Sequence, residues 1–129
     1  MPQMKMAYDE DPAKVLLDKL GDLSGLDVFN NQILVAIHVR PTKTKSGLYL
    51  TETHIDEDRY QGKVGLLVKM GPQAFVSDGK WFVDADFKVG QWLVLRQSDA
   101  WSVTIQGTLC KLLDDINVRG RVADPDMVF

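Results

Sequence analysis

The sequence predicts an all-β domain, a barrel or sandwich, preceded by one short helix. Six or seven short apolar runs follow one another from Val28 onward, and turn signals separate them every eight to twelve residues. No second helical pattern interrupts these runs, and a chain of 129 residues is expected to form one domain. We expect this domain at residues 27–122, with a helical extension at 1–26 and a tail at 123–129.

The first 26 residues contain a complete set of signals for one helix. Asp11 is a candidate N-cap, Pro12 would occupy the first helical position, and Gly21 would end the helix. The apolar residues fall on one face at helical spacing and are Val15, Leu16, Leu17 and Leu20. We expect this face to pack on the domain itself, and contact with a neighbouring subunit or partner is the alternative.

The strand predictions follow the apolar runs in order. The run "QILVAIHV" ends at Arg40-Pro41, and "KVGLLVKM" ends at the turn Gly71-Pro72. The stretch "QAFVSDGKWFVDA" is typical of a hairpin that turns at Asp78-Gly79, with arms at residues 74–76 and 81–83. The remaining strands are predicted in "FKVGQWLVLRQ", in the two arms of "WSVTIQGTLCKLL" and in "DDINVRGRV".

A core is predicted from the same runs. Because side chains alternate between the two faces of a strand, we expect most rather than all of the selected residues to be buried. The selected residues are Ile33, Leu34, Val35, Val64, Leu66, Val68, Trp92, Val94, Leu109 and Leu112.

The composition argues against several kinds of function. A net charge of −3 argues against a nucleic-acid surface, and no window approaches the roughly 18 apolar residues of a membrane span. The first residues lack the apolar centre of a secretory signal. One cysteine excludes an intrachain disulfide framework. We therefore expect an intracellular protein with no nucleic-acid or membrane partner.

No arrangement of residues predicts an enzyme. His38 alternates with apolar residues in the first strand, and Cys110 lies in an apolar strand, where a buried structural thiol is expected. Asp114 and Asp115 are adjacent in sequence and should point to opposite faces, so they cannot share a proton. His54 lies among acidic residues that lack the fixed ligand geometry of a cation site. We expect no catalytic residue, no metal and no cofactor.

One polar segment, residues 42–63, carries a compact apolar triplet. Gly47 precedes Leu48, Tyr49 and Leu50, and ten of the twelve residues from 51 to 62 are polar, charged or glycine. An apolar triplet on a polar loop is suited to docking in a hydrophobic groove of another protein. The alternative is that the triplet begins a strand packed on the domain itself.

The order of these elements resembles the GroES-type co-chaperonin (chaperonin-10) family. The resemblance covers residues 28–122 and rests on "NNQILVAIHV", "TKSGLYL", "QGKVGLLVKMGP", the "SDG" hairpin, "FKVGQWLVL" and "TLCKLLDDINVRGRV". The positions that match the family pattern are Gly47, Leu48, Tyr49, Leu50, Gly62, Val64, Gly71, Lys88, Val89, Gly90, Asp115 and Ile116.

The resemblance implies a GroES-like β-barrel with a mobile loop and a roof-type hairpin. It implies a cytoplasmic, non-enzymatic co-chaperonin that assembles as a heptameric ring and forms the lid of a GroEL-type chaperonin. The contact to the chaperonin apical domains would fall on Gly47, Leu48, Tyr49 and Leu50.

The resemblance also implies that subunits meet at the hairpin. Phe75, Trp81 and Phe82 are large side chains for a hairpin and are candidates for that oligomer interface. A hairpin folded over its own barrel is the alternative.

Several positions depart from the family pattern. Ser46 stands where a second glycine is usual, Tyr49 replaces an aliphatic residue, and Gln91 replaces an aspartate. The helix and the C-terminal tail have no counterpart in a minimal co-chaperonin, and divergence of this kind resembles that of co-chaperonins carried by viruses of bacteria. The alternative function is therefore a structural protein of a virus particle (a cement, decoration or connector subunit) that reuses the same fold, which would place it in the virion.

Overall fold

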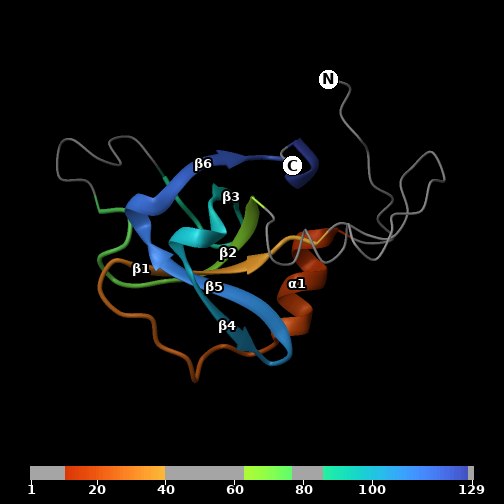
Figure 1. The fold of residues 1–129 in the computed structure, drawn as a ribbon. Coiled ribbons are helices and arrows are strands. Elements are labelled where there is room, and N and C mark those ends of the chain that lie inside the picture. Colours follow the sequence, from red (N-terminus) through yellow and green to blue (C-terminus); the bar gives the residue numbers. More distant parts are fainter. Residues whose placement is uncertain (1–10, 40–62, 77–85, 128–129) are drawn as a thin grey trace.

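One antiparallel sheet and one α-helix make up the described part of the protein (Figure 1). The structure is a computed structural model that describes residues 11–39, 63–76 and 86–127. Its elements are α1 (Pro12–Leu20), β1 (Gln32–Ile37), β2 (Val64–Met70), β3 (Trp92–Leu95), β4 (Trp101–Ile105), β5 (Thr108–Asp114) and β6 (Val118–Val122), with short 3-10 turns η1 (Gln97–Asp99), η2 (Asp115–Asn117) and η3 (Pro125–Met127). The strand order β4-β5-β1-β2-β3-β6 confirms the predicted all-β class.

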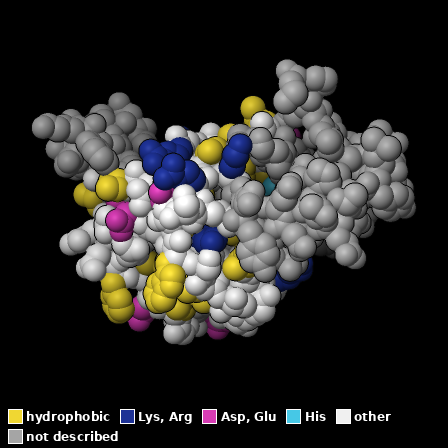
Figure 2. Space-filling view, in the orientation of Figure 1, with side chains coloured by type: hydrophobic (Ala, Val, Ile, Leu, Met, Phe, Trp, Pro, Cys, Tyr) yellow, Lys and Arg dark blue, Asp and Glu magenta, His cyan; other side chains and the backbone are white. Residues whose placement is uncertain are grey.

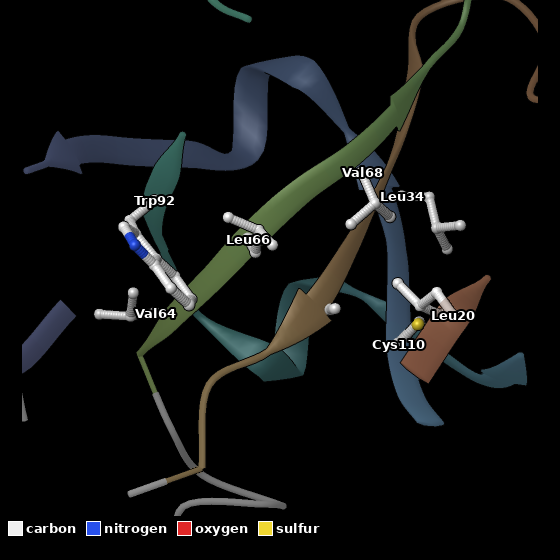
Figure 3. Close-up of a cluster of buried hydrophobic side chains, with 8 residues drawn as sticks. Leu20, Leu34, Val64, Leu66, Val68, Trp92 and Cys110 are labelled. Carbon is white, nitrogen blue, oxygen red and sulfur yellow. The ribbon is translucent and has the colours of Figure 1, made fainter. Parts of the chain in front are cut away.

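The central strands β1 and β2 are buried on both faces. Five consecutive residues are buried in each strand, at 33–37 and 64–68. Because successive side chains point to opposite faces, these residues divide into two apolar clusters. One cluster contains Leu34, Ala36, Val64, Leu66, Val68, Trp92 and Cys110 (Figure 3). The opposite cluster contains Ile33, Val35, Ile37, Leu67, Leu93, Leu95 and Leu113.

The sheet curls, and the short connection between β3 and β4, residues 96–100, joins strands from opposite sides of it. Arg119 in β6 forms an ion pair of 3.3 Å with Asp99, which lies just before β4. Ala100 in this connection and Val118 in β6 pack against the same apolar cluster. This curvature agrees with the barrel that the sequence predicts.

Helix α1 begins and ends at the residues that the sequence predicts. The Asp11 side chain accepts a hydrogen bond of 3.2 Å from the Ala13 backbone N–H, which caps the first turn. Gly21 follows the last helical residue with a φ of +67°, a conformation that glycine adopts without steric cost.

The helix and the segment after it cover the first of the two sheet faces. Leu20 is fully buried in the cluster of Figure 3, and Leu23, Leu26 and Val28 pack against the same cluster. The Lys69 ammonium of β2 donates to the backbone oxygens of Leu23, at 2.5 Å, and Leu26. The helix therefore packs on its own domain, as expected, although Leu17 is 37% exposed instead of contributing to the contact.

The core prediction holds for most of its residues. Seven of the ten are buried, and the other three, Val94, Leu109 and Leu112, are half-buried. Cys110 is fully buried, as its apolar strand predicts.

Replacing Leu20 with alanine tests the contribution of the helix to the fold. The change leaves a cavity against the first cluster, and we expect the free energy of unfolding to fall by about 2–5 kcal/mol in denaturant titrations. Leu17→Ala in the same helix is the matched control, and its effect should be much smaller because Leu17 is exposed. Equal effects of the two changes would contradict an integral role for α1.

Burial also makes the Cys110 thiol unreactive. Loss of hydration raises its pKa from 9.0 to about 11, so native protein at pH 8 holds almost no thiolate. We expect a thiol reagent to label Cys110 only after unfolding. Because the unfolded thiol ionises first, the free energy of unfolding should fall as pH rises from about 9 to about 11. Cys110→Ala should lack this component, and rapid labelling of the native protein would contradict it.

Candidate partner-binding site

The structure describes the places where two candidate binding segments leave the sheet. Gly47, Leu48, Tyr49 and Leu50 fall within residues 40–62, and Trp81 and Phe82 fall within residues 77–85, so these predicted site residues lie outside the described residues. The described residues on either side of these segments are 39 and 63 for the first segment, and 76 and 86 for the second. We call the described residues around the ends of the first segment the first base, and those around the ends of the second segment the second base.

The first base joins the end of β1 to the start of β2. Ile37 pairs with Gly65, and the His38 backbone N–H donates to the Val64 oxygen at 3.0 Å. His38 is buried and packs edge-on against Trp92, with ring centroids 5.1 Å apart. Residues 40–62 therefore leave and re-enter the sheet on adjacent strands, at a base whose side chains are buried.

Gly65 keeps this base tightly packed. A Cβ added at Gly65 would lie 3.0 Å from both Cβ and Cγ2 of Val35 and 3.3 Å from Cδ2 of Leu95. The absence of a side chain lets β1 and β3 residues fill the space over β2. The candidate loop is thus attached to a part of the sheet with little room for adjustment.

The second base is organised by one buried carboxylate, that of Asp115. Asp115 is 4% exposed and accepts hydrogen bonds from the Phe75 backbone N–H at 2.8 Å and from Asn31 Nδ2 at 3.1 Å. Its own N–H donates to the Asn31 oxygen at 3.1 Å. One side chain in η2 therefore fixes the chain before β1 and the chain that leads into residues 77–85.

Residues 74–76 do not form the strand that the sequence predicts as the first arm of a hairpin. The chain turns at residues 72–75, and Phe75 has a φ of +60°, which is unusual for a bulky residue. The hydrogen bond to Asp115 and the burial of the ring hold this conformation. The strand prediction was wrong here because apolar content alone does not distinguish a strand from a turn whose aromatic ring is buried.

Phe75 contributes its side chain to the core of its own subunit. Its ring stacks on Phe87 with centroids 4.0 Å apart, and both belong to the second apolar cluster. The Arg121 guanidinium lies 5.0 Å from the centre of the Phe87 ring. The role of Phe75 in contacts between subunits remains a prediction.

A tight backbone contact closes the second base. A Cβ at Gly71 would lie 2.3 Å from the Asn30 oxygen, so only glycine fits at this position. The Gly71 N–H donates to the Gln32 oxygen at 2.8 Å, and the Gln73 N–H donates to the Asn30 oxygen at 3.0 Å. Backbone hydrogen bonds therefore join the end of β2 to the turn before β1, in addition to the bonds of the Asp115 carboxylate.

Sequence reasoning missed the structural role of Asp115. It identified Asp115 only as a position that matches a family pattern, and it correctly separated Asp115 from Asp114. Asp114 accepts from the Gln32 side chain, whereas Asp115 accepts from Asn31 and Phe75. The available signal was an acidic residue directly after an apolar strand, at a turn, where buried backbone N–H groups need acceptors.

The described residues hold neither a cluster of metal-ligating side chains nor a membrane-spanning helix. In the ranges 11–39, 63–76 and 86–127, no group of three or more histidine, cysteine or acidic side chains is arranged to hold a metal ion. Within the same ranges, no helix combines the length and apolar character needed to cross a membrane.

Comparison with known proteins identifies one family. The family model of the chaperonin 10 kDa subunit matches residues 26–122, about three-quarters of the chain. The match includes both bases and the six strands found in the described residues, and it begins after α1. No curated protein sequence is significantly similar to this chain.

Replacing Asp115 with asparagine tests the second base. Asparagine offers one acceptor oxygen to two donors and places its own amide N–H against one of them. We expect the free energy of unfolding to fall by about 1–3 kcal/mol, measured by denaturant titration. Asp114→Asn is the matched control and should cost less, because Asp114 is half-buried and has a single side-chain partner, Gln32. Equal losses would argue against the central role of Asp115.

Proposed function

This chain belongs to the chaperonin 10 kDa subunit family, and on that premise we propose that it is a co-chaperonin that forms a ring-shaped lid on a GroEL-type chaperonin. The family match carries this proposal. In it, the chain performs no chemistry of its own and assists protein folding in the cytoplasm by closing the chaperonin chamber. Gly47, Leu48, Tyr49 and Leu50 bind the chaperonin apical domains.

The geometry of the first base supports this assignment. A segment that starts and ends on adjacent strands can be ordered by a partner without disturbing the sheet, because its two ends are already fixed next to each other. The buried His38, Val64 and Trp92 hold these ends in place. Gly47 supplies a residue with a wide range of backbone conformations immediately before the triplet.

The energetics of one triplet favour a multivalent assembly. Ordering a loop costs on the order of 1–2 kcal/mol for each residue fixed. Burying Leu48 and Leu50 in a groove contributes roughly 1.5–3 kcal/mol each. One loop therefore binds weakly, and a ring of identical loops binds firmly yet reversibly through effective concentration. This reasoning supports a homo-oligomer, for which we propose the seven subunits of the family.

The hairpin segment is the proposed place of subunit contact. Trp81 and Phe82 follow the second base, whose Asp115 and Phe75 fix the direction of the chain at residue 76. Because the Phe75 ring is buried in its own subunit, Trp81 and Phe82 are the stronger candidates for contact with a neighbour. The family match favours this co-chaperonin function over the alternative of a structural subunit in a virus particle.

A double substitution, Leu48→Ala with Leu50→Ala, tests the proposed contact. If the triplet serves binding, the free energy of unfolding should change by less than about 0.5 kcal/mol. Capture by an immobilised GroEL-type chaperonin in the presence of nucleotide should weaken by more than about tenfold, because every subunit loses the same contact. Sedimentation of the same samples reports the mass of the assembly, which should not change.

Two control substitutions separate binding from stability. Val89→Ala removes an exposed apolar side chain elsewhere and should preserve both capture and stability. Leu66→Ala removes a fully buried side chain and should lower the melting temperature. If the double variant instead lost several kcal/mol of stability and kept its partner, the triplet would belong to the core and the proposed contact would be wrong.

A further inference from the structure

The two edges of the sheet differ in how they are protected. Strand β6 ends the sheet on one side, and its sequence "VRGRV" contains Arg119, Arg121 and Gly120, which discourage pairing with another strand. Strand β4 ends the sheet on the other side, and "WSVTI" contains no charge, proline or glycine. No strand in the described residues pairs with the outer edge of β4. An edge without protection is suited to pairing with an additional strand.

The hairpin between β4 and β5 determines which backbone groups face that edge. Gln106 and Gly107 both have positive φ, at 49° and 81°, as in a two-residue turn of type I′. In such a hairpin the residues that flank the turn, Ile105 and Thr108, exchange hydrogen bonds, and the pattern alternates along the strand. The N–H and C=O groups of Ser102 and Thr104 therefore point away from β5, toward the free edge.

A buried cation lies beside the same edge. Lys111 pairs across β5 and β4 with Ser102, is only 6% exposed, and donates from its ammonium to Ser102 Oγ. No ion pair of Lys111 with an acidic side chain occurs among the described residues. Burial lowers the pKa of this amine. Because the side chain extends over Ser102, its charge lies at the edge strand and not at the centre of the sheet.

An apolar contact is available on the opposite face of β4. Trp101 is 72% exposed at the start of the strand. Figure 2 shows hydrophobic side chains gathered in the lower left part of the view, near the place where Figure 1 shows β4. A strand added to β4 would place alternate side chains against Trp101 and against Ser102.

We propose that the free edge of β4 binds an extended segment of a partner protein as an additional strand, in which an acidic side chain opposite Ser102 pairs with Lys111. The residues on either side of this acidic residue are apolar and face Trp101 and Val103. Charge complementarity with Lys111 sets the register, and the outward backbone groups of Ser102 and Thr104 supply the hydrogen bonds. This site is separate from the proposed loop contact and does not require a chaperonin.

Two labelled peptides test this site on the full chain. In the first, nine residues alternate threonine and valine except for one central glutamate flanked by valines, and the second carries glutamine at the centre. We expect fluorescence anisotropy to show about tenfold tighter binding of the glutamate peptide, as one charge-assisted hydrogen bond would give. Bound peptide should slow hydrogen exchange at the Ser102 and Thr104 amides.

Three variants identify the groups responsible. Lys111→Met should remove the preference for glutamate, and Lys14→Met, which changes an exposed lysine on α1, should retain it. Thr104→Pro removes one outward N–H without breaking the ladder to β5, and should abolish binding of both peptides. This variant decides the matter if Lys111→Met fails to fold, which circular dichroism would show.

Three results would overturn the proposal. The first is equal binding of the two peptides to the unmodified chain, or no binding of either. The second is binding without slowed exchange at Ser102 and Thr104. The third is slowed exchange of these amides through self-association in the absence of peptide, which would assign the edge to contacts between copies of this chain.

Discussion

The fold depends on the burial of β1 and β2 on both faces. Two adjacent strands with five consecutive buried residues each cannot be accommodated by a sheet with one face in water. Curling the sheet encloses one face, which gathers Ile33, Val35 and Leu67 with residues from β3 and β5. The other face remains to be covered, and helix α1 with residues 21–28 covers it. The helix is therefore required by the residues of the sheet, although it lies outside the family match.

This arrangement divides the chain by mechanical role. The sheet, the helix and the bonds around Asp115 and Lys69 form a framework in which side chains and backbone are densely paired. The residues proposed for partner binding are attached to this framework at His38 and Val64 and at Phe75. When a partner binds there, the free energy of contact can be used to order the binding segment of this chain, because the framework needs no rearrangement.

The positions of the strands could be predicted from the sequence, whereas the contacts between residues far apart in the chain could not. Apolar runs and glycine turns located β1, β2, β3, β4 and β5, because these signals are local. The same alternation placed Lys111 on a strand without showing that its face would be buried, since that depends on curling of the whole sheet. The turn at Phe75 was missed for a related reason. Its conformation is held by Asp115, forty residues later in the chain, and local sequence does not encode such a contact.

The sequence also predicted the helix better than its environment. Asp11, Pro12 and Gly21 defined its ends through capping, which involves neighbours in the chain. The apolar face was identified correctly at Leu20, whereas Leu17 proved exposed because the angle at which a helix lies on a sheet is set by tertiary packing. For the binding segments, the family resemblance supplied the expectation, and the structure supplies their points of attachment.

The cover over the first sheet face has a consequence for synthesis of the protein. Helix α1 leaves the ribosome before the strands, but Leu20 packs against Cys110, which is made ninety positions later. A nine-residue helix is marginal in water on its own. Its apolar side chains and those of β1 therefore cannot be buried until β5 has been synthesised. During this interval the nascent chain exposes apolar surface that the finished protein conceals. The chain proposed to close a folding chamber thus passes through a vulnerable stage of its own.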